Sequence, residues 1–193
     1  MSVYQALLKQ NKQWVANTLK TNSHYFSKLA EGQTPKVMVI GCADSRKPLN
    51  IITQTGPGEL FIVRNVANQA SLKDTGFLAA LDYGVNMLKV EHIIVCGHQG
   101  CGGVCAAFNT LDTTTDLGKW LTPIRTTYLD NQDEIDALPK TKRDQLLAEI
   151  NVQQQLHNIS ESDVMKTADK NGNAPVLHGW LFEISSGLIH EID

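Results

Sequence analysis

The sequence of 193 residues has little excess charge of one sign and no long apolar run. Its formal net charge of -3 at pH 7 gives no electrostatic reason to expect nucleic acid or an anionic membrane surface as a partner. No apolar stretch reaches the roughly 18 residues that suggest a membrane-spanning helix. The first twenty residues lack the basic segment and the apolar segment of a secretory signal. We therefore expect a cytoplasmic protein that binds neither nucleic acid nor membrane.

The chain also lacks internal repeats, low-complexity segments and a linker between two halves. Hydrophobic residues make up 42% of the sequence and charged residues 19%, which is typical of an ordinary soluble protein. A chain of this length can bury a core without disulfide bonds. We expect one domain over residues 1–193.

The apolar pattern predicts an α/β fold with a mainly parallel central sheet and flanking helices. Short apolar runs bounded by turn signals are typical of buried strands, and helices between them favour right-handed crossovers. The predicted strands cover residues 36–41, 59–64 and 91–97, and the predicted helices cover residues 75–89, 117–129 and 142–158. A closing hairpin is expected from residues 175–184 and 188–192, which adds an antiparallel edge strand.

Residues 3–19 predict an amphipathic helix at the N-terminus. Their apolar side chains recur at spacings close to one helical stripe. Such a stripe needs a surface to cover, either the core of its own chain or a neighbouring subunit. We expect an N-terminal helical arm.

Four cysteines are present, at Cys42, Cys96, Cys101 and Cys105. In a reducing compartment, cysteines are more often metal ligands, reactive thiols or buried small hydrophobes than disulfides. Cys42 follows the first predicted strand, whereas His98 and Cys101 follow the third. Side chains at the carboxyl ends of parallel strands can meet in one crevice where the strand order reverses. Two thiols and one imidazole suit Zn²⁺ and leave its fourth position for water.

Asp44 and Arg46 bear on the kind of zinc site. A guanidinium two residues away can hold the carboxylate off the metal, which keeps the fourth position open. Asp44 and Arg46 can equally form an ordinary surface ion pair. A structural zinc site would instead need a fourth protein ligand, which Cys96 or Cys105 could supply. Both of these cysteines also fit the role of small buried hydrophobes.

The segments CADSR, PGELFIVRNVAN and HQGC together resemble the β-class carbonic anhydrase family. With LLKQNKQW, LKVEHIIVCGH, GCGGV and HGWLFEI, the resemblance spans nearly the whole chain. It implies Zn²⁺ on Cys42, His98 and Cys101, with Asp44 and Arg46 as a catalytic dyad. It further implies reversible hydration of carbon dioxide to bicarbonate and a proton by zinc-bound hydroxide that the dyad orients.

Within the family, the stretch EGQTPKVMVIGCADSR resembles the plant-type branch. That resemblance implies that Gln33 hydrogen-bonds the substrate. It also implies that Phe61 and Tyr83 line the carbon dioxide pocket, partly across a dimer interface. Family members form homodimers, which are often paired into tetramers or larger assemblies. A helical arm over residues 1–30 would therefore pack on the partner subunit.

The sequence departs from the family pattern at a few positions. A second branch carries a regulatory bicarbonate site of Trp, Arg and Tyr. Here Arg64 is present, but Val39 replaces the Trp and Phe182 occupies the Tyr position, so we expect no bicarbonate regulation. Lys47 stands where an apolar residue is usual, and nothing in the sequence accounts for its effect.

Two alternative functions remain open at this point. The same zinc site and fold can serve a hydrolase of carbon disulfide or carbonyl sulfide. A non-catalytic protein that binds bicarbonate or carries structural zinc is the other alternative, and the Asp44–Arg46 pair and Gln33 argue against it.

Overall fold

The structure is a computed structural model that describes residues 1–192, and the chain forms two compact units. The first unit ends at Thr34 and contains the helices α1 (Val3–Thr21) and α2 (Tyr25–Ala30). α1 begins at a capping box, in which the side chains of Ser2 and Gln5 each accept a hydrogen bond from the other's backbone N–H.

No residue of α1 is buried, and most of its large apolar residues are exposed. The exposed large side chains on α1 are Val3, Tyr4, Leu7, Leu8, Trp14 and Leu19. The predicted helix is therefore present, and its packing on a partner subunit stays a prediction.

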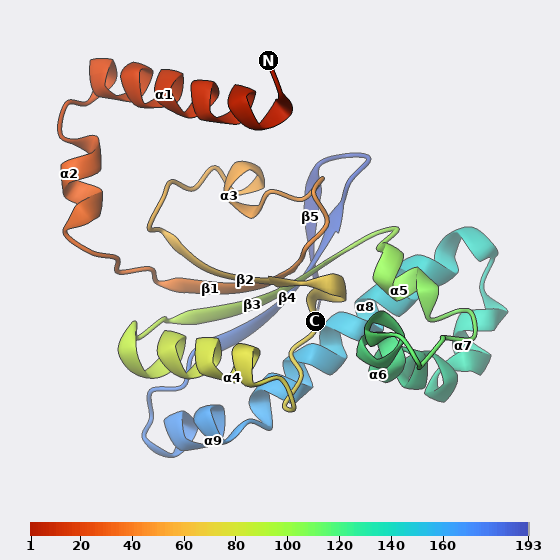
Figure 1. Cartoon of the computed structure of the whole chain (residues 1–193). Helices are drawn as coiled ribbons and strands as arrows, with labels where there is room; N and C mark the ends of the chain where they lie inside the picture. Colours follow the sequence, from red (N-terminus) through yellow and green to blue (C-terminus); the bar gives the residue numbers. More distant parts are fainter. Residues whose placement is uncertain (193) are drawn as a thin grey trace. The chain divides into compact units, whose positions relative to one another are not determined.

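The second unit, from Pro35 onward, is built on a five-stranded sheet in the order β2-β1-β3-β4-β5. Four strands run parallel, and β5 pairs with β4 in the antiparallel sense (Figure 1). The strands are β1 (Val37–Cys42), β2 (Leu60–Asn65), β3 (His92–His98), β4 (Val176–Glu183) and β5 (Leu188–Ile192). The predicted α/β fold with a mainly parallel sheet and an antiparallel edge strand is confirmed.

Helices of very different length connect these strands. The longer ones are α4 (Thr75–Asp82), which continues into the π-helical turn η2 (Tyr83–Met87), α6 (Asp116–Asp130) and α8 (Lys140–Ser160). These correspond to the three helices predicted over residues 75–89, 117–129 and 142–158. The shorter ones, which the sequence did not predict, are α3 (Leu49–Ile52), η1 (Val66–Asn68), α5 (Gly102–Ala106), α7 (Gln132–Ala137) and α9 (Asp163–Lys170). No helix within residues 1–192 is both long and apolar enough to cross a lipid bilayer.

Side chains of β1 alternate between two apolar clusters because successive residues of a strand point to opposite faces. Met38 and Ile40 pack with residues of α4, α8 and α9 on one face of the sheet (Figure 1). Val37 and Val39 belong to the cluster on the other face, beside α3. A third cluster involves α5, α6, α7 and α8 and includes Cys42.

The pairing register brings the carboxyl ends of β1 and β3 together. Gly41 is opposite Cys96, so Cys42 lies beside the end of β3 that carries His98. From β1 the chain moves to β2 on one side and later crosses to β3 on the other. The ends of β1 and β3 therefore flank the point where the strand order reverses, which is where open α/β sheets form their sites.

Candidate metal centre

Three buried side chains meet at the carboxyl ends of β1 and β3. Cys42 is the last residue of β1, His98 is the last residue of β3, and Cys101 is the N-cap of α5. One ligand atom from each lies within 4.8 Å of the others, and the two sulfur atoms are 3.8 Å apart. The structure thus brings together the three side chains that the sequence singled out.

The orientation of His98 leaves one ring nitrogen free for a metal. Its Nδ1 lies 3.1 Å from the carbonyl oxygen of Gln99, which can only accept, so Nδ1 carries the proton. Nε2 is then an acceptor, and it is buried with no hydrogen-bond partner among residues 1–192. A buried lone pair without a partner is costly unless something binds it. Together with two soft sulfur donors, this arrangement fits Zn²⁺.

The two thiols ionise unequally because they are so close. A hydrogen bond from Cys101 lowers the pKa of the Cys42 thiol. The hydrogen bond and the negative charge of Cys42, together with burial, raise the pKa of Cys101. The pair therefore holds one thiolate readily, and the second proton leaves easily only when a cation compensates the charge.

Asp44 is held by a fork of N–H donors from Arg46. Nε of Arg46 donates to Oδ1 at 3.0 Å and Nη2 donates to Oδ2 at 2.6 Å, while the backbone N–H of Arg46 donates to Oδ1 at 2.9 Å. These hydrogen bonds hold the pKa of Asp44 well below its usual range. Oδ1 thus accepts two hydrogen bonds and Oδ2 only one. Oδ2 is the oxygen that faces the cluster, 3.8 Å from Nε2 of His98.

Arg64, from the end of β2, fixes the backbone that carries these groups. Its Nε and Nη2 donate to the carbonyl of Cys42 at 3.1 and 3.0 Å, and Nη2 also donates to the carbonyl of Asp44 at 2.7 Å. The sequence connected Arg64 only with a regulatory site. Its position in the RNVAN segment, one residue before the end of β2, was the available signal for a role at the strand ends.

Neither remaining cysteine belongs to the three-residue cluster. Cys96 is fully buried in the sheet, in the cluster of apolar residues beside α3, and burial raises its pKa. Cys105 is half-buried on α5, and burial raises its pKa as well. Cys96 therefore sits as the buried-hydrophobe interpretation predicts, Cys105 is only partly buried, and the cluster holds no fourth cysteine.

Two of the three predicted substrate residues, Phe61 and Tyr83, do not lie in this cluster within one chain. Phe61 and Tyr83 contact each other, with ring centroids 5.8 Å apart. Phe61 is opposite Met38, four residues before Cys42, which corresponds to about 13 Å along the strand. Gln33 lies in the exposed segment of the N-terminal unit. The substrate-binding roles of Gln33, Phe61 and Tyr83 stay predictions.

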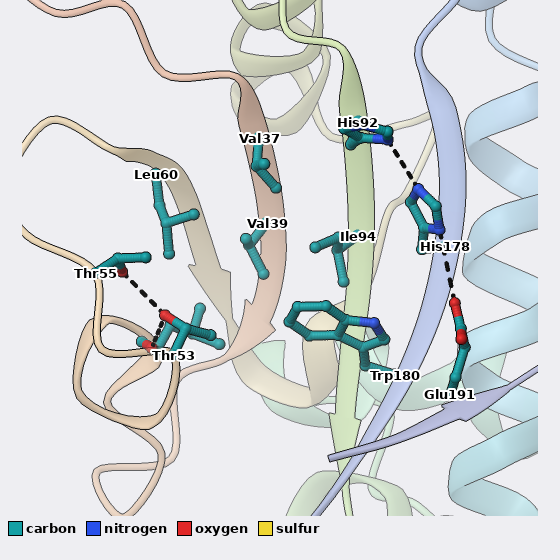
Figure 2. Close-up of a pocket in the computed structure, with 11 residues that line it drawn as sticks. Val37, Val39, Thr53, Thr55, Leu60, His92, Ile94, His178, Trp180 and Glu191 are labelled. Carbon is teal, nitrogen blue, oxygen red and sulfur yellow. Dashed lines mark hydrogen bonds and ion pairs between the residues drawn. The ribbon is translucent and has the colours of Figure 1, made fainter.

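A separate pocket of about 430 Å³ lies on the face of the sheet beside α3 and contains none of the three cluster residues. Figure 2 shows apolar side chains of β1, β3 and β4 beneath it and a polar row at one margin. In that row, Nδ1 of His92 lies 3.0 Å from Nε2 of His178, and Nδ1 of His178 lies 3.9 Å from Glu191. The sequence offered no partner for His92.

The fold and the cluster define an α/β protein with three Cys/His/Cys side chains that could hold a metal ion, at a switch point of the sheet. Residues 37–189 match the family model described as carbonic anhydrase. The chain therefore belongs to the carbonic anhydrase family, and similar solved structures that include two β-carbonic anhydrases described below place it in the β class.

Individual relatives agree over nearly the whole chain. A carbonic anhydrase of Emericella nidulans is 37% identical over 191 residues, which covers 97% of this chain and 82% of the relative. A tetrameric β-carbonic anhydrase of Sordaria macrospora superposes with a TM-score of 0.92 at 34% identity, covering 98% of this chain and 96% of that one. The Coccomyxa β-carbonic anhydrase in complex with acetazolamide superposes with a TM-score of 0.93 at 32% identity. This match covers 100% of this chain and 87% of that one.

Proposed function

We propose that the protein catalyses the reversible hydration of carbon dioxide to bicarbonate and a proton, with Zn²⁺ held by Cys42, His98 and Cys101. The observation that carries the proposal is the buried Cys/His/Cys cluster with the clamped carboxylate of Asp44 beside it. Membership of the carbonic anhydrase family supports it. A zinc ion at such a site would lower the pKa of a bound water and so supply a hydroxide nucleophile, although two thiolate ligands make that water less acidic than three histidines would.

The carboxylate of Asp44 provides an acceptor with a fixed direction. Because Arg46 holds it ionised and occupies both lone-pair positions of Oδ1, the free acceptor position is on Oδ2. Oδ2 faces the ring nitrogen of His98 that is free for a metal. A hydrogen bond to Oδ2 would therefore orient the attacking oxygen. Because the carboxylate is already held in place, it does not have to reorganise during the reaction.

Arg46 has a second role in the proposal. A carboxylate oxygen close to a metal centre can become a ligand itself, which would close the coordination position needed for water. The two side-chain hydrogen bonds from the guanidinium hold the carboxylate in place and oppose that movement. A structural zinc site would need a fourth protein ligand, and neither Cys96 nor Cys105 is in the cluster. The clamp on Asp44 argues against such a site as well, because it keeps this carboxylate from becoming the fourth ligand.

We further propose that the substrate pocket is completed by a second copy of the chain. Phe61 and Tyr83 pack together far along the sheet from the cluster of their own chain. A dimer could place this aromatic pair at the partner's site. The exposed apolar stripe of α1 needs such a partner, and the relative from Sordaria macrospora is tetrameric.

A stopped-flow hydration assay on protein of measured zinc content tests the proposed reaction. We expect Asp44→Asn to lower kcat/KM by about 10²–10⁴ at unchanged zinc content, since an oriented acceptor is removed but no ligand is. Asp116→Asn, at a fully exposed position in the first turn of α6, is the matched control and should keep wild-type activity. An Asp44→Asn variant within a few-fold of wild type would contradict the assigned role of this carboxylate.

A further inference from the structure

Lys47 is fully buried, three residues after Asp44. Its Nζ donates hydrogen bonds to the backbone carbonyls of Cys96 and of Gly97, the latter at 3.2 Å. Among residues 1–192 it forms no ion pair with a carboxylate. Lysine is almost never fully buried without a charged partner, because removing its ammonium group from water is costly. Its burial here therefore requires an explanation.

Nζ of Lys47 contacts the strand that carries one of the proposed metal ligands. Cys96 and Gly97 are the last two residues before His98 on β3. Gly41, the residue before Cys42, is in close contact with this segment, since a Cβ there would lie 3.0 Å from the Cδ1 atom of Leu49 and 3.8 Å, an ordinary contact distance, from Nζ. Lys47 thus connects the segment that leaves β1 with the end of β3, beneath the metal centre.

We propose that Lys47 is a positioning residue for the metal centre. Its hydrogen bonds hold the end of β3 against the segment after β1, and thereby set His98 relative to Cys42 before a metal arrives. Burying the lysine costs free energy, and this cost is offset only if holding the strand ends in one arrangement improves metal binding. The inference rests on the proposed zinc site, and it concerns metal affinity more than the chemical step.

The test compares zinc affinity in the wild type and in Lys47→Met, which keeps an unbranched side chain, one atom shorter, and removes its donors. Affinity is measured by competition with a chromophoric chelator, at a temperature at which both metal-free proteins are folded by circular dichroism. We expect Lys47→Met to bind zinc about 10–100-fold more weakly. Lys73→Met, at an exposed position in a loop, is the matched control and should bind zinc as the wild type does.

The ligand-field spectrum of the cobalt(II)-substituted protein gives a second measurement that a purely structural role would not change. We expect altered bands in Lys47→Met because the geometry of the three ligands relaxes. If Lys47→Met does not fold, Lys47→Gln replaces it, with one side-chain amide donor and an intermediate loss of affinity expected.

Zinc binding within twofold of the wild type, with an unchanged cobalt spectrum, would overturn the role of Lys47 and leave the proposed function intact. A wild-type protein that binds no zinc would overturn both.

Discussion

A methyl group added at Gly103 should disturb the metal centre, whereas one added at Gly102 should not. Both glycines lie on α5, immediately after Cys101. A Cβ at Gly103 would lie 2.9 Å from Cγ1 of Val66 and 3.0 Å from Cβ of Ala67, well inside the 3.5–4.0 Å that carbon atoms prefer. A Cβ at Gly102 meets no atom within 4 Å.

The segment opposite Gly103 is poorly able to move away. The carbonyl of Val66 accepts a hydrogen bond from Nε1 of Trp120 at 2.8 Å, and the carbonyl of Ala67 accepts one from Nδ2 of Asn151 at 3.2 Å. The added methyl group should therefore displace α5. That movement carries Cys101 away from its place in the cluster.

The magnitude follows from two opposing terms. Replacing glycine by alanine in a helix stabilises it by about 0.5–1 kcal/mol, and this gain applies to both variants. Overpacking costs about 1–3 kcal/mol and applies to Gly103→Ala alone. The difference in the free energy of unfolding between the two variants should thus be about 1–3 kcal/mol. For a chain of this length that corresponds to about 2–12 °C in Tm.

Thermal unfolding of the zinc-free variants, followed by circular dichroism at one protein concentration, measures this difference. We expect Gly103→Ala to melt below the wild type and Gly102→Ala at or above it. Chelator competition should show weaker zinc binding for Gly103→Ala only. Melting temperatures within 1 °C of each other would refute the reasoning, because they would mean that the close contact of α5 with Val66 and Ala67 is not limiting.

Metal addition and pH give two further predictions. Free Zn²⁺ at 100 times its Kd should stabilise the folded protein by about 2.7 kcal/mol and raise its Tm, whereas Mg²⁺ should not. The variant Cys42→Ser should abolish this zinc-dependent rise in Tm, and Cys105→Ser should leave it unchanged. Arg46 depresses the pKa of Asp44 in the folded state, so the stabilisation is complete above the ordinary value of 3.8 and is lost as pH falls through the lower folded value. The Tm difference between wild type and Asp44→Asn should hence stay constant from pH 8 to pH 5; a steady change across that interval would show that Asp44 titrates there.

The strands and the cluster could be predicted because their signals are local. β1 and β3 are buried along nearly their whole length and appear as short apolar runs, and each run ends at a candidate ligand or its neighbour. Since parallel strands end at the same edge of a sheet, Cys42 and His98 had to come close once β1 and β3 were neighbours. The hydrogen-bonded pair of Asp44 and Arg46 is likewise local, since the two partners are two positions apart in the chain.

The short helices could not be predicted from local pattern. α5 begins with Gly102 and Gly103, which are poor helix formers, and is only five residues long. It forms because the segment packs against α6 and η1 around Cys101 and Val104. Tertiary packing thus overrides a weak local propensity in this segment.

Only the tertiary structure decided what Arg64 and Lys47 do. Their partners lie 22 and about 50 positions away in the chain, on strands whose register no local pattern specifies. The sequence by itself determined which residue types stand at the ends of which strands. The fold decided that a buried lysine lies beneath those ends and that Phe61 and Tyr83 lie far from them, because both depend on how strands distant in sequence align.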